Sequence, residues 1–374
     1  MKRVMIIAGE ASGDMHAAQV VKVMHAKNSG LEFFGIAGPQ MRAQGVEAIV
    51  KTETIAIMGF IEVLMNFKTI YHTYQKVKQA LLQHKPDLLI LVDYPGFNLK
   101  VAKLAKQCGI KVLYYISPQI WAWRQGRIKK IKQCVDMMAV VFPFELKFYE
   151  AHQVPVRYVG LPLFDELDFN LTQSQARTKL NLLPEVTTIT LLPGSRSAVV
   201  TTLLPVMMDA VKLLKHQFST LQFVLPIAST LSKEIFAAFI PAELNIKLIE
   251  GQSQLAIKAS DAVISTSGTS TLETALFGVP LVVIYKMNAL SFQIIKRLIK
   301  IKMIALCNIV AEKPIVKELI QHQLTAEAIA EEIKRILTDK VYNSQLRTEL
   351  AAVRFKLDKH GAAENVATLA LSMM

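Results

Sequence analysis

Short hydrophobic runs alternate along this chain with longer segments in which apolar positions recur at helical spacing. In the first half, the runs predict strands at 4–8, 32–36, 88–92, 111–116, 138–142 and 156–160. After a polar, mixed connection that begins near Pro162, the pattern restarts, with strands predicted at 188–192, 222–226, 246–250, 262–266 and 281–285. Strands that alternate with helices in this way are typical of parallel α/β sheets.

The restart of the pattern predicts two doubly wound, Rossmann-like domains. We expect an N-terminal domain at 1–165 and a second domain at 166–340. From Thr325 onward the chain has helical character throughout, and we expect 341–374 to form helices that pack back on the N-terminal domain. A length of 374 residues agrees with about two domains.

The first half carries polar residues directly after two of its predicted strands. Sheets of this kind bind ligands at the carboxyl ends of their strands, where loops meet helix N-termini. Glu10, Ser12 and Asp14 follow the first strand, although Ser12 or Asp14 would equally serve as a helix cap. Asp93 ends strand 88–92 and opens DYPGFN. This is a suitable position for a general base, and a turn-forming aspartate is the simpler alternative.

The second half carries two loops suited to phosphate groups. LLPGSR follows one predicted strand and STSGTSTLE follows another, and both offer glycine turns and backbone N–H groups. The candidate residues are Gly194, Ser195 and Arg196 in the first loop and Gly268, Thr269, Ser270 and Glu273 in the second. Ser270 and Glu273 also fit a capping box, in which Glu273 would bond only its own helix terminus. Together with the acidic loop of the first half, these loops predict a nucleotide-sugar cleft between the domains.

The sequence shows no pattern typical of a metal site or of a disulfide framework. No D-x-D pair is present, the histidines are scattered, and the cysteines are Cys108, Cys134 and Cys307, far apart and without a C-x-x-C. We therefore expect no cofactor, a metal-free mechanism and a reducing cytoplasm as the location.

The net charge of +13 is concentrated in two stretches without acidic residues, between Asp93 and Asp136 and between Glu273 and Glu312. Such surfaces attract polyanions or anionic lipid, unless they are simply solvated. Within the first stretch, SPQIWAWRQGRIKKIK interleaves both tryptophans of the chain with bases. This composition is used by binders of nucleic acid and of membrane surfaces alike.

Two further segments combine apolar residues with an amphipathic pattern. Phe60 to Val77 keeps an apolar stripe at helical spacing, which fits either a core-facing helix or a contact with acyl chains. Segment 288–306 pairs apolar residues with bases and has no acid, as interfacial helices do.

The motifs GEASGD, DYPGFN, SPQIWAWR, FPFE, LLPGSR, SGTSTLETAL and VKEL occur in this order along the chain. In this combination the sequence resembles the lipid-A-disaccharide synthase family, which consists of inverting glycosyltransferases with the GT-B fold. GEASGD and SPQIWAWR are the most specific of these motifs. The resemblance spans most of the chain.

The resemblance implies transfer of 2,3-diacylglucosamine from its UDP derivative to the 6-hydroxyl of 2,3-diacylglucosamine 1-phosphate. The products are a β-1,6-linked disaccharide 1-phosphate and UDP. It also implies two Rossmann-like domains facing across a cleft, and Asp93 as the base. The implied acceptor-site residues are Glu10, Ser12, Asn98, Arg124 and Arg127. The implied nucleotide-sugar residues are Gly194, Ser195, Arg196, Gly268, Thr269, Ser270, Glu273 and Asn308.

The family also suggests where the protein works. We expect a cytoplasmic enzyme that associates peripherally with the anionic inner membrane of a Gram-negative bacterium and does not bind nucleic acid. The C-terminal segment is a candidate homodimer contact. One departure is that Val199 stands where the family usually has a glutamate, three residues after the arginine of GSR.

Three alternatives remain open on sequence alone. One is another GT-B enzyme that transfers N-acetylglucosamine to a lipid-linked acceptor, and a second is a UDP-sugar epimerase of similar fold. The third is a non-enzymatic nucleic-acid binder, which would be retained on DNA with a steep salt dependence.

Overall fold

A computed structural model describes residues 2–56, 67–123, 125–288, 292–293 and 303–374. The chain divides into two compact units, and each is described by itself. Unit 1 comprises residues 1–165 together with 359–374, and unit 2 comprises 166–358.

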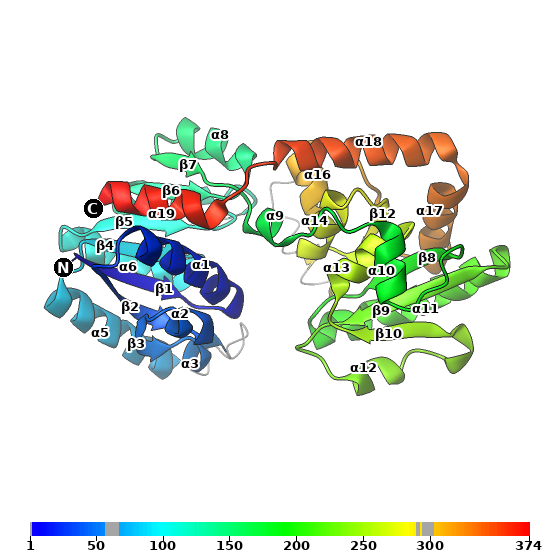
Figure 1. The fold of residues 1–374 in the computed structure, drawn as a ribbon, viewed down its shortest axis with the longest axis horizontal. Helices are drawn as coiled ribbons and strands as arrows, with labels where there is room; N and C mark the ends of the chain where they lie inside the picture. The colour runs from blue at the N-terminus through cyan, green and yellow to red at the C-terminus, as the bar shows by residue number, and fades with distance from the viewer. Residues whose placement is uncertain (1, 57–66, 124, 289–291, 294–302) are drawn as a thin grey trace. The chain divides into compact units, whose positions relative to one another are not determined.

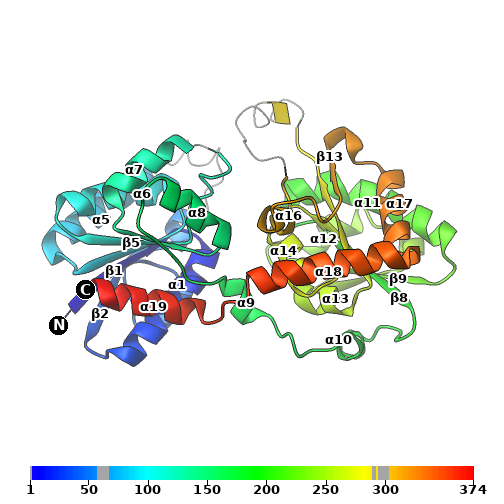
Figure 2. The ribbon, with the colours of Figure 1, turned by 90° about the horizontal axis from the view of Figure 1, so that it is seen from above.

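Unit 1 is built on a parallel sheet with the strand order β3-β2-β1-β4-β5-β6-β7. The strands are β1 (Lys2–Ala8), β2 (Leu31–Ala37), β3 (Glu47–Lys51), β4 (Leu88–Val92), β5 (Lys111–Tyr115), β6 (Met137–Val140) and β7 (Val156–Tyr158). Its helices are α1 (Ala11–Lys27), α2 (Pro39–Ala43), α3 (Glu53–Ala56), α5 (Phe67–His84), α6 (Pro95–Gln107), α7 (Ile128–Cys134), α8 (Pro143–Ala151) and α19 (Ala362–Met373). In Figures 1 and 2, α5, α6 and α7 cover one face of this sheet, while α1 and α19 lie on the other. Because both faces are covered, the central strand β4 is buried along its whole length.

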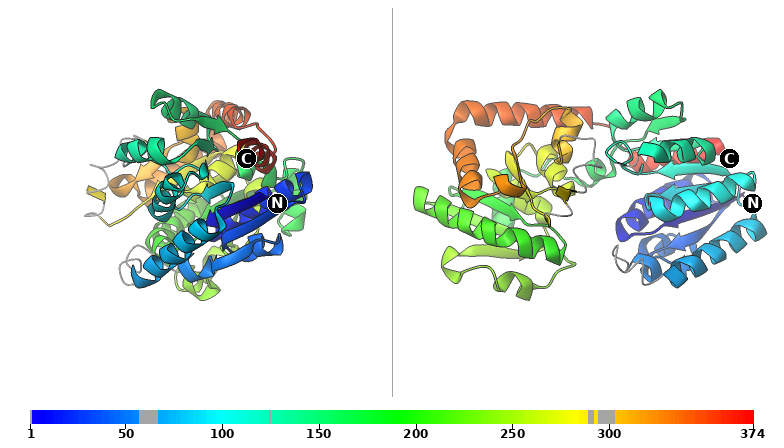
Figure 3. Two further views of the ribbon diagram at one scale, coloured as in Figure 1. Left: turned by 90° about the vertical axis from the view of Figure 1, so that its left-hand side faces the viewer. Right: turned by 180° about the vertical axis from the view of Figure 1, so that it is seen from behind.

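Unit 2 repeats this design with the strand order β10-β9-β8-β11-β12-β13. The strands are β8 (Thr187–Leu192), β9 (Leu221–Ile227), β10 (Ile246–Glu250), β11 (Ala262–Thr266), β12 (Leu281–Tyr285) and β13 (Glu318–Ile320). The helices are α10 (Gln173–Lys179), α11 (Ser197–Gln217), α12 (Lys233–Ala237), α13 (Ser253–Ala259), α14 (Thr269–Leu276), α16 (Leu306–Ala311), α17 (Ala326–Thr338) and α18 (Lys340–Lys356). Helices α11 and α17 pack together, and α13 and α14 also contact one another and the sheet (Figure 3). The short helix α9 (Pro162–Glu166) lies where the chain passes from unit 1 to unit 2.

The doubly wound architecture predicted from the sequence is confirmed, and each predicted strand is present. Two strands were missed, β3 and β13, and both form an edge of their sheet. β13 has only three residues and β3 begins and ends with a charged residue, so neither shows the apolar run of a central strand.

The C-terminal helices are divided between the units. α18 belongs to unit 2, where it contacts α14, α16 and α17, whereas α19 belongs to unit 1 and packs on α1. The chain therefore returns to unit 1 after Asp358, later than the boundary at 340 that the sequence pattern suggested.

Helix α11 is the one described helix that is long and apolar enough to cross a membrane. Its apolar side chains between Val200 and Leu214 are buried in unit 2, so here it serves as a core helix.

Three described residues of the apolar stripe face a core, while Tyr71, also part of the stripe, is 51% exposed. In α5, Val77 is fully buried and Ile70 and Tyr74 pack against the core of unit 1. This is the ordinary core-facing alternative. The rest of the stripe, and most of segment 288–306, lies outside the described residues.

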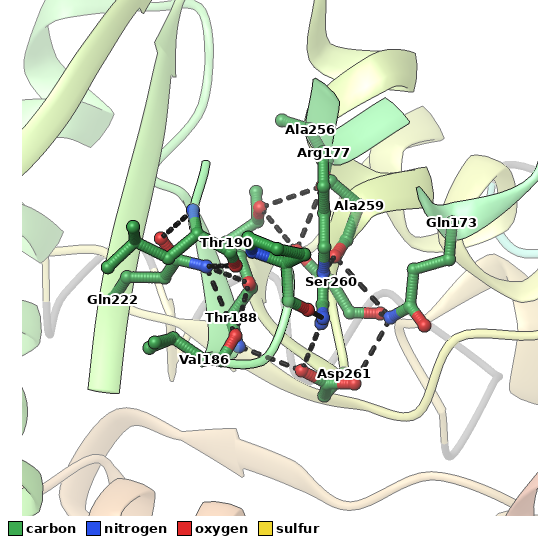
Figure 4. A network of polar contacts seen from close by, with 12 residues as sticks. Gln173, Arg177, Val186, Thr188, Thr190, Gln222, Ala256, Ala259, Ser260 and Asp261 are labelled. Carbon is green, nitrogen blue, oxygen red and sulfur yellow. Dashed lines mark hydrogen bonds and ion pairs between the residues drawn. The ribbon is translucent and has the colours of Figure 1, made fainter. Parts of the chain in front are cut away.

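A buried polar network fixes the start of the unit 2 sheet (Figure 4). Arg177 of α10 forms an ion pair of 2.7 Å with Asp261, and its Nε donates to the carbonyl of Ala259 at 3.0 Å. The Asp261 carboxylate also accepts the backbone N–H of Thr188 at 2.8 Å. Because Asp261 and Thr188 lie at the amino ends of β11 and β8, this network joins α10 to the sheet edge opposite the candidate site.

Candidate active site

Each sheet has one position where the strand order reverses, and in doubly wound folds this position forms the ligand crevice. In unit 1 it lies between β1 and β4, where Ala8 pairs with Val92. In unit 2 it lies between β8 and β11, where Leu192 pairs with Ser265. The loops singled out from the sequence leave these four strands, so the topology brings them together in pairs.

Asp93 and Glu10 form the acidic part of the unit 1 crevice. Glu10 is exposed and Asp93 is partly buried. Burial, with a smaller effect from the nearby negative charge of Glu10, raises the pKa of Asp93 to about 6, while a hydrogen bond from the Tyr94 backbone opposes both effects. A carboxylate with this pKa is a stronger base than an ordinary aspartate and is still mostly ionised at neutral pH.

Gly9 is required here by a close contact. A β-carbon at Gly9 would lie 2.4 Å from the ring of Tyr94, so only glycine lets this ring lie over the β1 loop. Burial, with a smaller effect from Glu10, also raises the pKa of Tyr94.

Asp14 has a structural role that the sequence did not reveal. Its buried carboxylate accepts the backbone N–H groups of Gly38, Gln40 and Met41 at 2.8, 2.9 and 3.2 Å. These groups belong to the start of α2, so Asp14 caps that helix and not the helix in which it lies. Ser12, two residues earlier in the first turn of α1, is exposed.

Asn98 lies beneath Asp93 and is fully buried. Its Nδ2 donates to the carbonyl oxygens of Val92 and Asp93, at 3.1 and 2.7 Å. Tyr114, on the neighbouring strand β5, donates its hydroxyl to the same Asp93 carbonyl at 2.6 Å. Tyr114 is not recognisable as a site residue from the sequence, because a tyrosine within an apolar strand is typical of a protein core.

Of the two arginines expected at the acceptor site, Arg127 is described and Arg124 lies outside the described residues. Arg127 is partly buried just before α7. Its positive charge acts on Tyr114, lowering the pKa of that hydroxyl against the larger effect of burial, which raises it well above the usual value. Arg127 therefore belongs to the same cluster as Tyr114 and the Asp93 carbonyl.

The two tryptophans of SPQIWAWR have different environments. Trp121 is buried and meets Phe144 edge to face, with ring centroids 4.9 Å apart. Trp123 is 40% exposed. Trp121 thus supports the loop from beneath, and Trp123 is the tryptophan available to a ligand.

In unit 2, the GSR turn opens helix α11. Gly194 has φ = +109°, a conformation that favours glycine, and Ser195 and Arg196 are exposed. The Ser195 carbonyl accepts a hydrogen bond from Thr230 at 3.0 Å, which fixes the turn. The first N–H groups of α11 and the Arg196 guanidinium are the groups suited to a diphosphate.

Val199, which replaces the usual family glutamate, packs beside this turn. A β-carbon at Gly194 would lie 3.4 Å from Val199 Cγ1 and 3.2 Å from Thr266 Cγ2. The valine therefore lies close to Gly194, on the side that Thr266 also faces.

The second loop of unit 2 begins helix α14 with Gly268 as the N-cap and Thr269 as the first helical residue. The capping-box alternative is therefore wrong, because Ser270 already lies within the helix; its hydroxyl contacts Ser265 Oγ at 2.9 Å. Glu273 is partly buried, and burial, with the nearby charge of Glu166, raises its pKa. Its carboxyl is thus not engaged as a cap.

Asn308 is fully buried, unlike the other nucleotide-sugar candidates. Its Oδ1 accepts the N–H groups of Ile315 and Val316, both at 2.9 Å, and its Nδ2 donates to Glu318 at 2.8 Å. Glu318 in turn accepts the N–H of Ala305 at 2.9 Å. In this structure Asn308 shapes the loops around β13, and a contact with nucleotide-sugar stays a prediction.

Among the residues that the structure describes, no group of three or more His, Cys, Asp or Glu side chains is arranged to hold a metal ion. The metal-free mechanism and the cleft between domains both stay predictions.

The topology of the two units identifies the fold of this protein. Two doubly wound units with this topology form the GT-B fold of sugar-nucleotide glycosyltransferases and epimerases. The structure is similar to that of MnaA of S. aureus solved with UDP, with a TM-score of 0.67 and 12% identity over 100% of this chain and 98% of that one. It is also similar to the glycosyltransferase of kitacinnamycin, with a TM-score of 0.66 and 14% identity over 100% of this chain and 99% of that one. At these identities the likeness establishes the fold alone.

The sequence comparisons then give the family. The model of the lipid-A-disaccharide synthetase family matches residues 4–369. A lipid-A-disaccharide synthase of Trichlorobacter lovleyi is 50% identical over 100% of this chain and 98% of its own length, and one of Geobacter metallireducens is 47% identical over 100% and 97%. The corresponding protein of Coxiella burnetii is 42% identical over 98% of this chain and 97% of its own. The chain belongs to the lipid-A-disaccharide synthetase family and is a glycosyltransferase; the epimerase and the other lipid-linked transferase are not favoured.

Proposed function

We propose that this enzyme joins the diacylglucosamine of its UDP derivative to diacylglucosamine 1-phosphate, with Asp93 as the base. The observation that carries the proposed role is the position of Asp93. It stands at the carboxyl end of β4, beside the β1 loop, and burial together with Glu10 raises its pKa to about 6. An inverting displacement needs one base and a stabilised leaving group, and this arrangement supplies the base.

In the proposed step, the acceptor 6-hydroxyl attacks the anomeric carbon of the donor sugar. The new O6–C1 bond forms while the bond from C1 to the diphosphate oxygen breaks with its electron pair. The proton of the hydroxyl passes to the Asp93 carboxylate, and UDP leaves. Because a sugar hydroxyl is very weakly acidic, the proton moves only as the C–O bond forms, and orientation supplies much of the rate.

The leaving group would be stabilised by unit 2. The N-termini of α11 and α14, with the Arg196 guanidinium, present positive charge and N–H donors where the diphosphate develops negative charge. Glu273 would accept a hydrogen bond from the ribose. Its raised pKa reflects a partly buried carboxyl near Glu166, which a ribose hydroxyl would help to satisfy.

The test supplies both lipid substrates and measures disaccharide and UDP. Asp93→Asn keeps the shape of the side chain and removes the base, so kcat should fall about 10²- to 10⁴-fold while UDP binding is retained. Near-normal turnover by this variant would remove Asp93 from the mechanism. Turnover of UDP-N-acetylglucosamine alone, without disaccharide formation from the lipids, would refute the proposed reaction.

We further propose that the enzyme works at the cytoplasmic face of the inner membrane. Support comes from α6 and α7, which contact each other and carry exposed lysines. These are Lys100, Lys103 and Lys106 on α6 and Lys129 and Lys132 on α7. Attraction to anionic lipid falls with salt, so binding to vesicles that contain anionic lipid should be strong at low salt and weak at high salt. Failure to sediment with them at low salt would refute this.

We also propose a homodimer formed through the C-terminal segment, on the evidence of two exposed apolar side chains of α18. Val341 and Phe355 of α18 are 79% and 81% exposed, and a partner could bury them. Light scattering on the wild type and on Phe355→Asp tests the proposal. A monomeric wild type would refute it.

A further inference from the structure

The backbone of Asp93 and Tyr94 adopts an unusual conformation. Asp93 has φ = +45° and Tyr94 has φ = +48° with ψ = +54°, so two consecutive residues with side chains lie in the left-handed region. Each such residue costs roughly 1–2 kcal/mol, and Tyr94 also precedes Pro95, a position that prefers extended backbone. The surrounding structure must therefore hold this turn in place.

Two buried side chains hold it from below. The Asp93 carbonyl accepts the Tyr114 hydroxyl at 2.6 Å and Asn98 Nδ2 at 2.7 Å, and both side chains are fully buried. The backbone N–H of Asp93 donates to the carbonyl of Tyr115 at 3.0 Å. The peptide groups on both sides of the Asp93 α-carbon are thus fixed by neighbours on β5 and α6.

We propose that Tyr114 and Asn98 are positioning residues for the base, acting through the backbone carbonyl of Asp93. This inference rests on the proposed role of Asp93. With its carbonyl held by two donors, Asp93 keeps its left-handed conformation, and this conformation sets the direction in which the carboxylate leaves the strand. If the donors were lost, the residue would relax toward the extended region and the carboxylate would turn away.

The burial of Asn98 decides how it acts. A fully buried side chain whose amide hydrogens already serve two carbonyls does not reach an acceptor sugar. Its buried Oδ1 has no hydrogen-bond partner within the described part of the chain, which costs stability. Asn98 therefore serves the acceptor site through Asp93, and the proposal replaces the direct contact expected from the sequence.

The main experiment uses Tyr114→Phe, which removes one hydroxyl and keeps the ring that fills the core. A misplacement of about 1 Å costs about 10²-fold in rate, so we expect kcat to fall roughly 10- to 100-fold, with the KM of both substrates nearly unchanged. The matched control is Tyr342→Phe in unit 2, which also removes a partly buried hydroxyl, bonded there to Glu332 at 2.5 Å. The control should keep the kcat of the wild type.

A second measurement separates positioning from general stability. Tyr114→Phe is combined with Asp93→Asn, and the residual rate of the double variant is compared with that of Asp93→Asn alone. If the hydroxyl acts through the base, it has nothing left to position, and the double variant should lose no further activity. If Tyr114→Phe lowered the rate of the Asp93→Asn variant by the same factor as it lowers the rate of the wild type, the inference would be overturned. The hydroxyl would then support the fold in general.

The remaining outcomes distinguish this inference from the proposed function. A normal kcat for Tyr114→Phe, with Asp93→Asn inactive, overturns the positioning role and leaves Asp93 as the base. A normal kcat for Asp93→Asn overturns the role of the base, and the positioning role falls with it.

Discussion

The carboxyl of Glu145 allows a quantitative prediction about stability. Glu145 lies in the first turn of α8 and is 1% exposed. Its Oε2 accepts the backbone N–H of Phe142 at 3.1 Å. Burial raises the pKa of Glu145 from 4.5 to about 7, against smaller opposing effects from the Phe142 N–H, Ser117 and Trp121. Glu145 therefore lies directly beneath the loop that carries both tryptophans.

A higher pKa in the folded state means that the folded protein binds the proton more tightly than the unfolded chain does. The stability contributed by Glu145 is therefore complete below pH 4.5, falls as the pH rises, and is lost above about pH 7. At about 1.4 kcal/mol per pH unit, the rise of the pKa from 4.5 to about 7 corresponds to about 3 kcal/mol.

The perturbation is Glu145→Gln, which still accepts the Phe142 N–H but cannot ionise. Relative to the wild type, the variant should gain about 3 kcal/mol in free energy of unfolding between acidic pH and pH 8, with most of the gain between pH 5 and 8. Urea unfolding followed by tryptophan emission measures it, and the only tryptophans, Trp121 and Trp123, both lie in unit 1. The control is Glu150→Gln, at an exposed position of the same helix.

If the difference between the Glu145→Gln variant and the wild type did not change with pH, the buried carboxyl would not be held in its neutral form, and the prediction would be wrong. A pH-dependent gain of equal size in the Glu150→Gln control would also refute it, because burial would then not be the cause.

Three further predictions concern the site and the second unit. Glu10→Gln removes the negative charge that helps to raise the pKa of Asp93, so the acid limb of the kcat profile, expected near pH 6 in the wild type, should move to lower pH; an unmoved limb would separate Glu10 from the base. Gly9→Ala places a methyl group 2.4 Å from the Tyr94 ring, so activity assays should show a large loss of turnover. Normal turnover would show that the ring moves aside without consequence. Arg177→Leu leaves the partly buried Asp261 carboxylate without its cation and the Ala259 carbonyl without its Arg177 donor, so it should destabilise unit 2 by roughly 1–3 kcal/mol; limited proteolysis should then cut unit 2 first, and uniform resistance would contradict the prediction.

Much of the fold follows from local sequence pattern. Strands buried on both faces need continuous apolar runs, so β4 is recognisable from its five residues. The edge strands β3 and β13 are not, because β3 begins and ends with a charged residue and β13 has only three residues. The division of the last helices between the units cannot be predicted from the sequence. An amphipathic pattern shows that a helix packs one face against something, but it does not show against which unit.

The same distinction applies to the site. The local pattern puts Asp93, Gly194 and Gly268 directly after strands, and in a parallel sheet this position is the ligand edge. The roles of individual polar groups depend on the folded chain, because hydrogen bonds join residues that are distant in sequence or whose geometry the sequence does not show: Asp14 caps α2, and Asn98 donates to the Asp93 carbonyl. A sequence shows which side chains are available, and the fold decides which atoms they meet.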